Sequence, residues 1–205
     1  MTITKAPQQD NSTFPAKIEL RRLALQQVTN PVVMETHGGY GELYDACYYG
    51  VVETGVVFER EFARAAFLAR QRPAWAVYEG ECQLALAAGV GSHLTVNLLD
   101  VDPYGSAWDA IPAFFNSPRP FADRMALVVN DGLRYGVKLG KSWQVKTLQP
   151  LVERFGNDLW DKYLDVCGIM LQEAIQPAGY SVRFFDGYYA GIGKKMTHFL
   201  AVLEK

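Results

Sequence analysis

The sequence predicts an α/β fold in which helices cover both faces of a seven-stranded, mostly parallel sheet. Short apolar runs alternate with amphipathic stretches along most of the chain, which is the pattern of successive strand–helix units. The last two strand-like runs are separated only by AGIGKK, so they predict a C-terminal antiparallel hairpin. In such a sheet, functional residues gather at the carboxyl ends of the parallel strands.

Hydrophobic periodicity places the elements in order. A first helix over residues 16–28 has an apolar face that includes Leu20 and Ala24, with Arg21 off that face. Further helices are expected over 41–51, 60–71, 82–89 and 157–176. Arg72 is grouped with the arginines of an ordinary outer helix. Strands are expected over 32–35, 55–59, 74–80, 94–102, 126–131, 180–189 and 196–204.

Length and composition favour one soluble domain. With 205 residues and 49% apolar content, the chain can bury a sizeable core. We expect residues 1–15 to form a flexible polar arm and residues 16–205 to form the domain. The first segment has no apolar core of signal-peptide length, and no later run approaches the ~20 apolar residues that span a bilayer. No membrane contact is therefore expected.

Charge and cysteine content narrow the range of functions. The net charge of −2 and the pI near 5.9 exclude a uniformly basic nucleic-acid-binding surface but leave room for a local basic patch. Cys47, Cys82 and Cys167 are odd in number and widely spaced, so neither a disulfide framework nor a zinc site is predicted. We expect a metal-free protein of the reducing cytoplasm, and the oligomeric state stays open.

Acidic residues end four consecutive predicted strands. Glu35 ends the first strand, Glu59 the second, the segment 79–81 the third, and Asp100 with Asp102 the fourth. A carboxylate at a single strand end is commonplace as a helix cap. Four such ends at the same edge of one sheet instead predict a shared site.

Glycines follow the first strand in the segment ETHGGYGELY, where they suit a backbone that turns tightly and approaches a ligand. The pattern from Glu35 through Gly39 to Gly41 resembles the cofactor loop of class I S-adenosylmethionine-dependent methyltransferases, whose fold is Rossmann-like. His37 stands where many members carry a first glycine, although amino-directed DNA adenine methyltransferases also lack it. His37 is expected either to contact the methionine end of the cofactor or to bond to backbone.

Two further segments extend this resemblance. Glu59 follows Gly41 by 18 positions, close to the ~20 expected for an acid that binds ribose hydroxyls of NAD or S-adenosylmethionine. In YEGEC, Glu81 resembles the methyltransferase acceptor of the adenine amino group, with the Cys82 backbone beside the ring, which favours S-adenosylmethionine. The resemblance thus implies a cofactor site that consists of Glu35, His37, Gly39, Gly41, Glu59, Glu81, Cys82 and Asp100.

The segment DVDPYGS, which follows the fourth predicted strand, resembles the Asp/Asn-Pro-Pro-aromatic element of methyltransferases that act on exocyclic amino groups. It is closer to the Asp-x-Asp-Pro-Phe-Gly-Ser form of tRNA guanine N2-dimethyltransferases, although Tyr104 replaces Phe and their large C-terminal domain is not found here. The resemblance implies a catalytic set. Asp102 would orient the amino protons, Pro103 would stiffen the turn, and Tyr104 would stack on the base.

The leading hypothesis is an S-adenosylmethionine-dependent N-methyltransferase that acts on an exocyclic amino group of a nucleobase in RNA or DNA. A small-molecule or protein methyltransferase remains an alternative, because the acidic pI weakens the nucleic-acid argument. A catalytically silent methyltransferase-like binding module is a second alternative.

Other polar segments have two interpretations each. The segment 133–146 carries Arg134, Lys138, Lys141 and Lys146 among aromatics, and suits either a flexible lid over nucleic acid or a solvated connection. The segment 130–132 predicts either a lining of the target pocket or a tight turn. His93 and His198 are expected to be structural.

Overall fold

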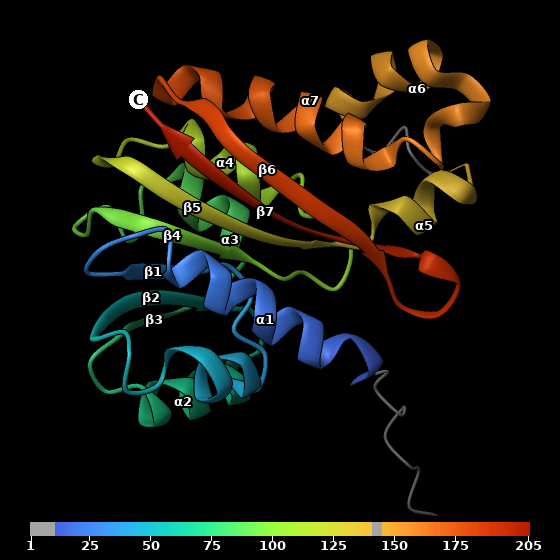
Figure 1. The fold of residues 1–205 in the computed structure, drawn as a ribbon. Coiled ribbons are helices and arrows are strands. Elements are labelled where there is room, and N and C mark those ends of the chain that lie inside the picture. The colour runs from blue at the N-terminus through green and yellow to red at the C-terminus, as the bar shows by residue number, and fades with distance from the viewer. Residues whose placement is uncertain (1–10, 141–144) are drawn as a thin grey trace, which may run out of the picture.

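The computed structural model describes residues 11–140 and 145–205 (Figure 1). Its centre is a seven-stranded sheet of order β3-β2-β1-β4-β5-β7-β6. Strands β3, β2, β1, β4 and β5 are parallel, whereas β7 pairs antiparallel with both β5 and β6. The fold class expected from the sequence is therefore confirmed, including the C-terminal hairpin. The strands are β1 (Val32–Glu35), β2 (Thr54–Glu59), β3 (Ala76–Glu79), β4 (Val96–Val101), β5 (Phe121–Asp131), β6 (Ser181–Ala190) and β7 (Met196–Glu204).

Helices cover both faces of the sheet. On one face, α1 (Phe14–Leu25), α2 (Phe62–Gln71) and a π-helical turn at Tyr44–Tyr48 share an apolar cluster with the strands. The cluster on the other face is larger. It includes residues of α3 (Cys82–Ala87), α4 (Ala110–Phe115), α5 (Leu133–Lys138), α6 (Gln149–Phe155) and α7 (Tyr163–Ile175).

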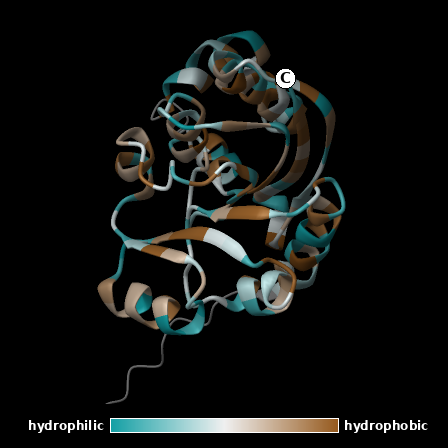
Figure 2. Cartoon of the chain, turned by 90° about the vertical axis from the view of Figure 1, so that its left-hand side faces the viewer, coloured by the Kyte–Doolittle hydropathy of each residue, from teal (hydrophilic) through white to brown (hydrophobic). Residues whose placement is uncertain are grey.

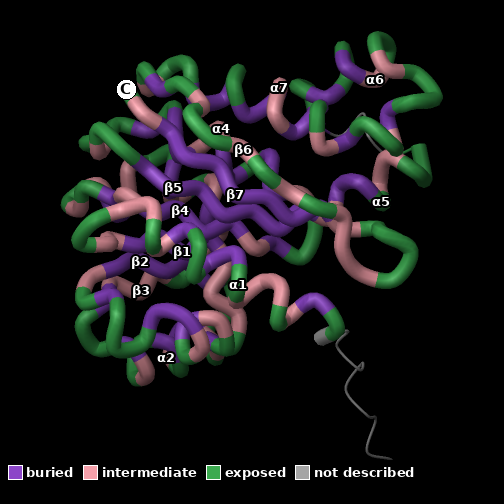
Figure 3. The backbone as a smooth tube through the Cα atoms, in the orientation of Figure 1, coloured by how far each residue is buried: buried purple, intermediate pink, exposed green. Residues whose placement is uncertain are grey.

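The central strands are buried on both sides. Along β4, Leu98 packs in the cluster with α1 and α2, whereas Leu99 and Val101 pack in the opposite cluster. Figure 3 shows the central strands as continuously buried, and Figure 2 shows hydrophobic residues along them. This double burial explains why the strands read as unbroken apolar runs in the sequence.

The helix predictions needed several corrections. The helix expected over 41–51 spans residues 42–48, mostly as the π-helical turn, and Gly50 after it adopts a φ of +73°. The helix expected over 157–176 is divided, because a 3-10 turn at Gly156–Leu159 precedes α7. The short helices α4, α5 and α6 were missed, since six or seven residues give too little periodicity to detect.

The N-terminal boundary also differs from the prediction. Residues Asn11–Thr13 form a 3-10 turn, and α1 begins at Phe14 with Pro15 in its first turn, where a missing amide proton costs nothing. Residues 11–15 are thus helical, and the rest of the predicted arm, residues 1–10, lies outside the described residues. Among the helices described, none is long and apolar enough to cross a membrane.

Candidate functional site

The carboxyl ends of the parallel strands lie side by side at one edge of the sheet. Glu35 is in register with Val57 of β2 and with Asp100 of β4, and Glu59 is in register with Glu79 of β3. The segments that leave these strands therefore meet at this edge. We take this edge as the candidate site.

The glycine segment after β1 is anchored to the end of β2. The Gly38 amide donates to the Phe58 carbonyl and the Gly39 amide to Glu59 Oε2, each over 2.9 Å. The second Glu59 oxygen accepts from the Glu61 amide over 2.9 Å. A β-carbon on Gly39 would meet no atom within 4 Å. The segment thus presents open backbone beside the Glu59 carboxylate. About two of the four lone pairs of this carboxylate are not used by the Gly39 and Glu61 amides.

Gly41 has a different role. Its φ is +79°, and a β-carbon there would lie 2.1 Å from Gln71 Oε1 of α2. The Gln71 amide group in turn donates to Asp45 Oδ2 over 2.8 Å. Gly41 therefore permits a tight turn under α2, whereas the prediction gave it a direct cofactor contact.

His37 lies between β1 and the start of α3. Its Nδ1 is 2.8 Å from Thr36 Oγ1 and its Nε2 is 3.7 Å from Cys82 Sγ. Burial lowers the pKa of His37 and raises the pKa of the Cys82 thiol to about 11. The two groups are therefore neutral near pH 7, and Cys82 is not an activated nucleophile.

The passage from β3 to α3 exposes both backbone and charge. Glu81 forms a solvent-exposed ion pair with Arg60 over 3.2 Å. Gly80 has a φ of +151° and no atom within 4 Å of its β-carbon position. No side chain caps the start of α3, so its first amide groups remain available to a ligand.

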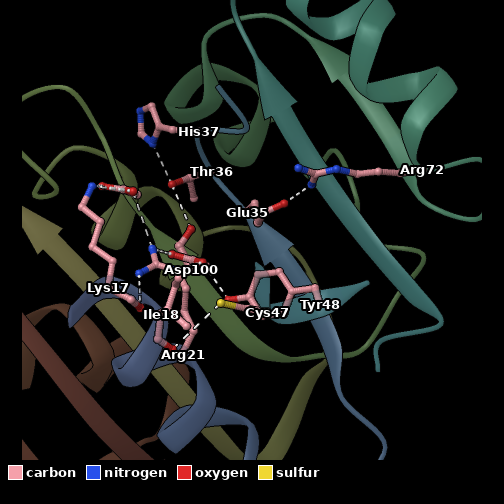
Figure 4. Close-up of polar contacts among 11 residues, drawn as sticks. Lys17, Ile18, Arg21, Glu35, Thr36, His37, Cys47, Tyr48, Arg72 and Asp100 are labelled. Carbon is pink, nitrogen blue, oxygen red and sulfur yellow. Dashed lines mark hydrogen bonds and ion pairs between the residues drawn. The ribbon is translucent and has the colours of Figure 1, made fainter. Parts of the chain in front are cut away.

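Asp100 is held inside the protein by α1 and the π-helical turn (Figure 4). Arg21 donates to its two oxygens over 2.7 and 2.5 Å, and the Tyr48 hydroxyl donates over 2.7 Å. Arg21 is fully buried, not on a polar helix face, because this carboxylate compensates its charge. The Asp100 side chain, expected from the sequence to lie at the cofactor site, thus joins α1 to the sheet.

Glu35 is the second strand-end acid that turns inward. It forms a buried ion pair with Arg72 (Figure 4), and the guanidinium carbon of Arg72 lies 4.2 Å from the centre of the Tyr44 ring. Burial raises the pKa of Glu35, and the charge of Arg72 counteracts part of this rise. Arg72 is thus the buried partner of Glu35 and not a surface arginine.

Asp102 follows β4 and meets Lys17 of α1. Lys17 Nζ lies 2.7 and 2.8 Å from the two Asp102 oxygens, and Arg21 Nη2 lies 3.7 Å from one of them. Burial alone would raise the pKa of Asp102, but Arg21 and Lys17 together hold it below its ordinary value. Asp102 is therefore an ionised acceptor at neutral pH, and it retains 15% side-chain exposure.

The rest of the Asp-Pro-Tyr-Gly turn combines a buried and an exposed residue. Pro103 is buried, whereas the Tyr104 ring is fully exposed. The Gly132 amide donates to the Gly105 carbonyl over 2.7 Å, which ties the turn to the end of β5. The turn thus presents an aromatic ring at the candidate site on an anchored backbone.

The segment after β5 follows the buried Asp131 and continues into helix α5. Asp131 ends β5 and accepts hydrogen bonds from the Ala107 and Leu133 amides and from the Tyr163 hydroxyl. Residues Leu133–Lys138 form α5, in which Arg134 is 2% exposed. Lys141 lies outside the described residues.

A comparison with protein-family models finds no match, and none of the curated proteins matches. Solved structures do match. Trm1 from Pyrococcus horikoshii in complex with S-adenosyl-L-methionine has a TM-score of 0.61 at 12% identity, covering 100% of this chain and 59% of that one. TYW2 from M. jannaschii in complex with AdoMet gives 0.59 at 10%, covering 98% and 79%. The N-methyltransferase NodS from Bradyrhizobium japonicum WM9, in complex with S-adenosyl-L-homocysteine, gives 0.59 at 11%, covering 99% and 93%.

The chain has the Rossmann-like class I methyltransferase fold. Several strand-end residues of this chain keep open space or free lone pairs. Gly39 and Gly80 leave open space beside the backbone, and Glu59 keeps lone pairs for hydroxyl donors. Among the described residues, no three His, Cys, Asp or Glu side chains are grouped as metal ligands.

Sequence reasoning missed the basic and aromatic partners of the acids, which are Lys17, Arg21, Tyr48 and Arg72. One signal was present for two of them. Lys17 and Arg21 are four positions apart, so they share one side of a helix. That side could have been matched to Asp102 and Asp100, two positions apart and therefore on one face of the strand.

Proposed function

We propose that this chain is an S-adenosylmethionine-dependent methyltransferase that acts on an exocyclic amino group of a nucleobase in RNA or DNA. The observation that carries the proposal is the turn at 102–105. It places an ionised carboxylate and a fully exposed aromatic ring at the end of β4, in the same edge of the sheet as Glu59 and Gly39.

The residues suited to the cofactor are those with free polar capacity. Glu59 would accept hydrogen bonds from ribose hydroxyls through the lone pairs that the Gly39 and Glu61 amides do not use. Glu81 and the first amides of α3 would meet the adenine amino group and ring, with open backbone at Gly80. His37 lies beside the start of α3, with its Nε2 3.7 Å from Cys82 Sγ. S-adenosylmethionine supplies an electrophilic methyl group when bound.

Asp102 would act on the target nitrogen. A conjugated amino group is a poor nucleophile, so an acceptor must orient its protons while the nitrogen becomes tetrahedral. The lowered pKa of Asp102 suits this role, because the carboxylate is ionised at neutral pH. Tyr104 would hold the base by stacking, and the buried Pro103 would fix the turn between them.

The cysteines are in keeping with an enzyme of the reducing cytoplasm, which is where we propose that it acts. Cys47, Cys82 and Cys167 are all free and buried. No disulfide joins them, and their burial protects the thiols.

One observation favours a second candidate, a methyltransferase-like binding module without turnover. Both Asp102 oxygens already accept from Lys17, so the acceptor must exchange a partner before it can bind an amino group. A module of this kind would bind the cofactor and leave it unchanged.

The test separates binding from transfer. Calorimetry with S-adenosylmethionine and S-adenosylhomocysteine measures cofactor binding, and incubation with methyl-labelled S-adenosylmethionine plus separated RNA, DNA, protein and metabolite fractions measures transfer. Label in RNA or DNA on an amino nitrogen supports the proposal. Cofactor binding with label in none of the four fractions supports the silent module. Label in protein or metabolites shows a methyltransferase with a substrate other than nucleic acid. No binding of either compound rejects both candidates.

A further inference from the structure

A basic–aromatic surface lies beside the Asp-Pro-Tyr-Gly turn and takes no part in the cofactor site described above. It combines exposed lysines from α5 and from the loop between β6 and β7 with an exposed ring from α5 and a partly buried ring from the segment before α7. Its members are Tyr135, Lys138, Trp160, Lys194 and Lys195. Figure 1 shows α5 and the β6–β7 loop at the same end of the sheet.

Arg134 joins the three segments of this surface. Its guanidinium donates to the Trp160 carbonyl over 3.1 and 2.8 Å and also to the Lys194 carbonyl. The same guanidinium carbon lies 3.6 Å from the ring centres of both Trp160 and Tyr189. An arginine held between two rings and two carbonyls fixes α5 against the hairpin loop.

The lysines of the surface have no acidic partner. Lys138 Nζ lies 5.1 Å from the Trp160 ring centre, and Lys195 Nζ lies 4.4 Å from the Tyr135 ring centre. Lys138, Lys194 and Lys195 are all exposed, and none forms an ion pair with a carboxylate of the described residues. Three lysines without an ion-pair partner among the described residues thus belong to this surface, on a protein whose net charge is −2.

The surface is connected to the turn through backbone. Gly132, which directly precedes α5, donates to the Gly105 carbonyl, and Tyr104 is the residue before Gly105. On the other side of the turn, Glu59 and Glu81 carry negative charge at the ends of β2 and β3. Glu81 is paired with Arg60, whereas the lysines on the α5 side form no ion pair within the described residues, so the α5 side is the one suited to attract a polyanion.

We propose that this surface binds the backbone of a single-stranded nucleic acid and directs an unpaired base to Tyr104. The inference rests on the proposed function for its substrate class, but the binding it describes requires no methyl transfer. Lysines without acidic partners release counterions from phosphates, and aromatic faces stack on bases of any sequence. The fully exposed Tyr104 ring offers a stacking face to a base that is not already stacked inside a duplex.

The test uses fluorescence anisotropy with a labelled 20-nucleotide RNA of mixed sequence, DNA of the same sequence, and the DNA duplex. A variant with Lys138→Gln, Lys194→Gln and Lys195→Gln should bind single strands at least tenfold more weakly at low salt. The slope of log affinity against log salt should fall by about 2, because about 0.7 of a counterion is released per phosphate contact on a single strand. The ratio of the affinities for RNA and DNA of the same sequence shows which nucleic acid the surface prefers.

A matched variant controls for net charge. Arg22→Gln, Arg70→Gln and Lys205→Gln remove the same charge from exposed residues of α1, α2 and the C-terminus, and should leave binding within about twofold of wild type, because nonspecific attraction is only weakly changed. Equal losses in both variants, an unchanged slope in the lysine variant, tighter binding of the duplex, or no wild-type binding of any probe would overturn the proposal.

Failure of this inference is distinguishable from failure of the proposed function. Titration of S-adenosylhomocysteine into the same preparations reports the cofactor site alone. Normal cofactor binding with no effect of the lysines on nucleic-acid binding rejects the surface only. Loss of nucleic-acid binding in the lysine variant, in a protein that binds no cofactor, supports the surface and rejects the methyltransferase.

Discussion

The guanidinium of Arg21 binds both carboxylate oxygens of Asp100, with an Nε–Oδ2 distance of 2.7 Å and an Nη2–Oδ1 distance of 2.5 Å. This bidentate contact joins the first helix to the central strand that precedes the candidate catalytic turn. Arg21 is fully buried and Asp100 is 2% exposed. Helix α1 is thereby a fixed part of the site.

Replacement of Arg21 should lower the free energy of unfolding. Arg21→Met leaves Asp100 buried without its cation, and breaking a buried pair costs about 3–5 kcal/mol. Urea denaturation measures the free energy of unfolding. Arg22→Met, on the exposed face of the same helix, is the control and should change it by less than about 0.5 kcal/mol. The pair is unimportant for stability if both variants unfold alike.

A double variant shows how much of the stability loss comes from leaving the Asp100 carboxylate buried without a cation. Arg21→Met combined with Asp100→Asn removes the uncompensated carboxylate while the Tyr48 hydroxyl can still donate to the amide oxygen. We expect it to recover at least half of the stability lost by Arg21→Met. A double variant no more stable than the single one would show that the cost arises from packing of the arginine.

The sequence predicted the sheet better than the helices. Strands buried on both faces read as apolar runs, so the residues of β1, β2 and β7 could be located almost to their ends. The short helices α4 and α5 depend on tertiary contacts, such as those of Arg134 with the β6–β7 loop. Such contacts leave no periodic pattern.

The sequence predicted which acids lie at the sheet edge but not which of them form internal ion pairs. Strand order alone brings Glu35, Glu59 and Asp100 to one edge, which a reading of strand ends can foresee. Which of these carboxylates faces a ligand depends on where the cations lie. Arg21 and Arg72 turn Asp100 and Glu35 into internal pairs, and burial of an arginine was not predictable from helix periodicity.

His198 should make the protein less stable in acid. The residue is fully buried in β7, and burial, helped by Lys17 and Arg21 and opposed by Asp102, lowers its pKa to about 4. Below pH 6.5 the unfolded chain takes up a proton that the folded protein does not, so stability falls as pH falls from 6.5 towards 4. Between pH 7.5 and 5.0 this amounts to about 2 kcal/mol.

Variants isolate the contribution of this histidine. Urea denaturation of His198→Gln at pH 7.5 and 5.0 should show a drop in stability smaller than that of wild type by about 2 kcal/mol. His93→Gln, on an exposed loop, should keep the wild-type drop. Equal drops in wild type and His198→Gln would contradict a neutral buried His198.

Glu59 should affect cofactor affinity. Glu59→Gln keeps an oxygen that can accept a hydrogen bond from the Gly39 amide but loses the charged acceptor. The binding free energy of S-adenosylhomocysteine should therefore weaken by about 1.5–3 kcal/mol, and its Kd should rise accordingly. Calorimetry measures this change. Glu79→Gln removes an exposed charge one strand away and should bind as wild type does. Identical affinities in the two variants would remove Glu59 from the proposed cofactor site.

Asp102 is expected to act in the chemical step. Its contact with the target amino group strengthens as the nitrogen becomes tetrahedral, so Asp102→Asn should bind S-adenosylhomocysteine normally and lose about 100-fold or more in single-turnover methyl transfer. Asp109→Asn changes an exposed carboxylate on the same connection and should transfer at the wild-type rate. If the only role of Asp102 is its ion pair with Lys17, the two variants will transfer equally fast, and Asp102→Asn will differ in stability alone. That result would leave the exposed ring of Tyr104 as the remaining reason to assign an amino-directed reaction to this turn.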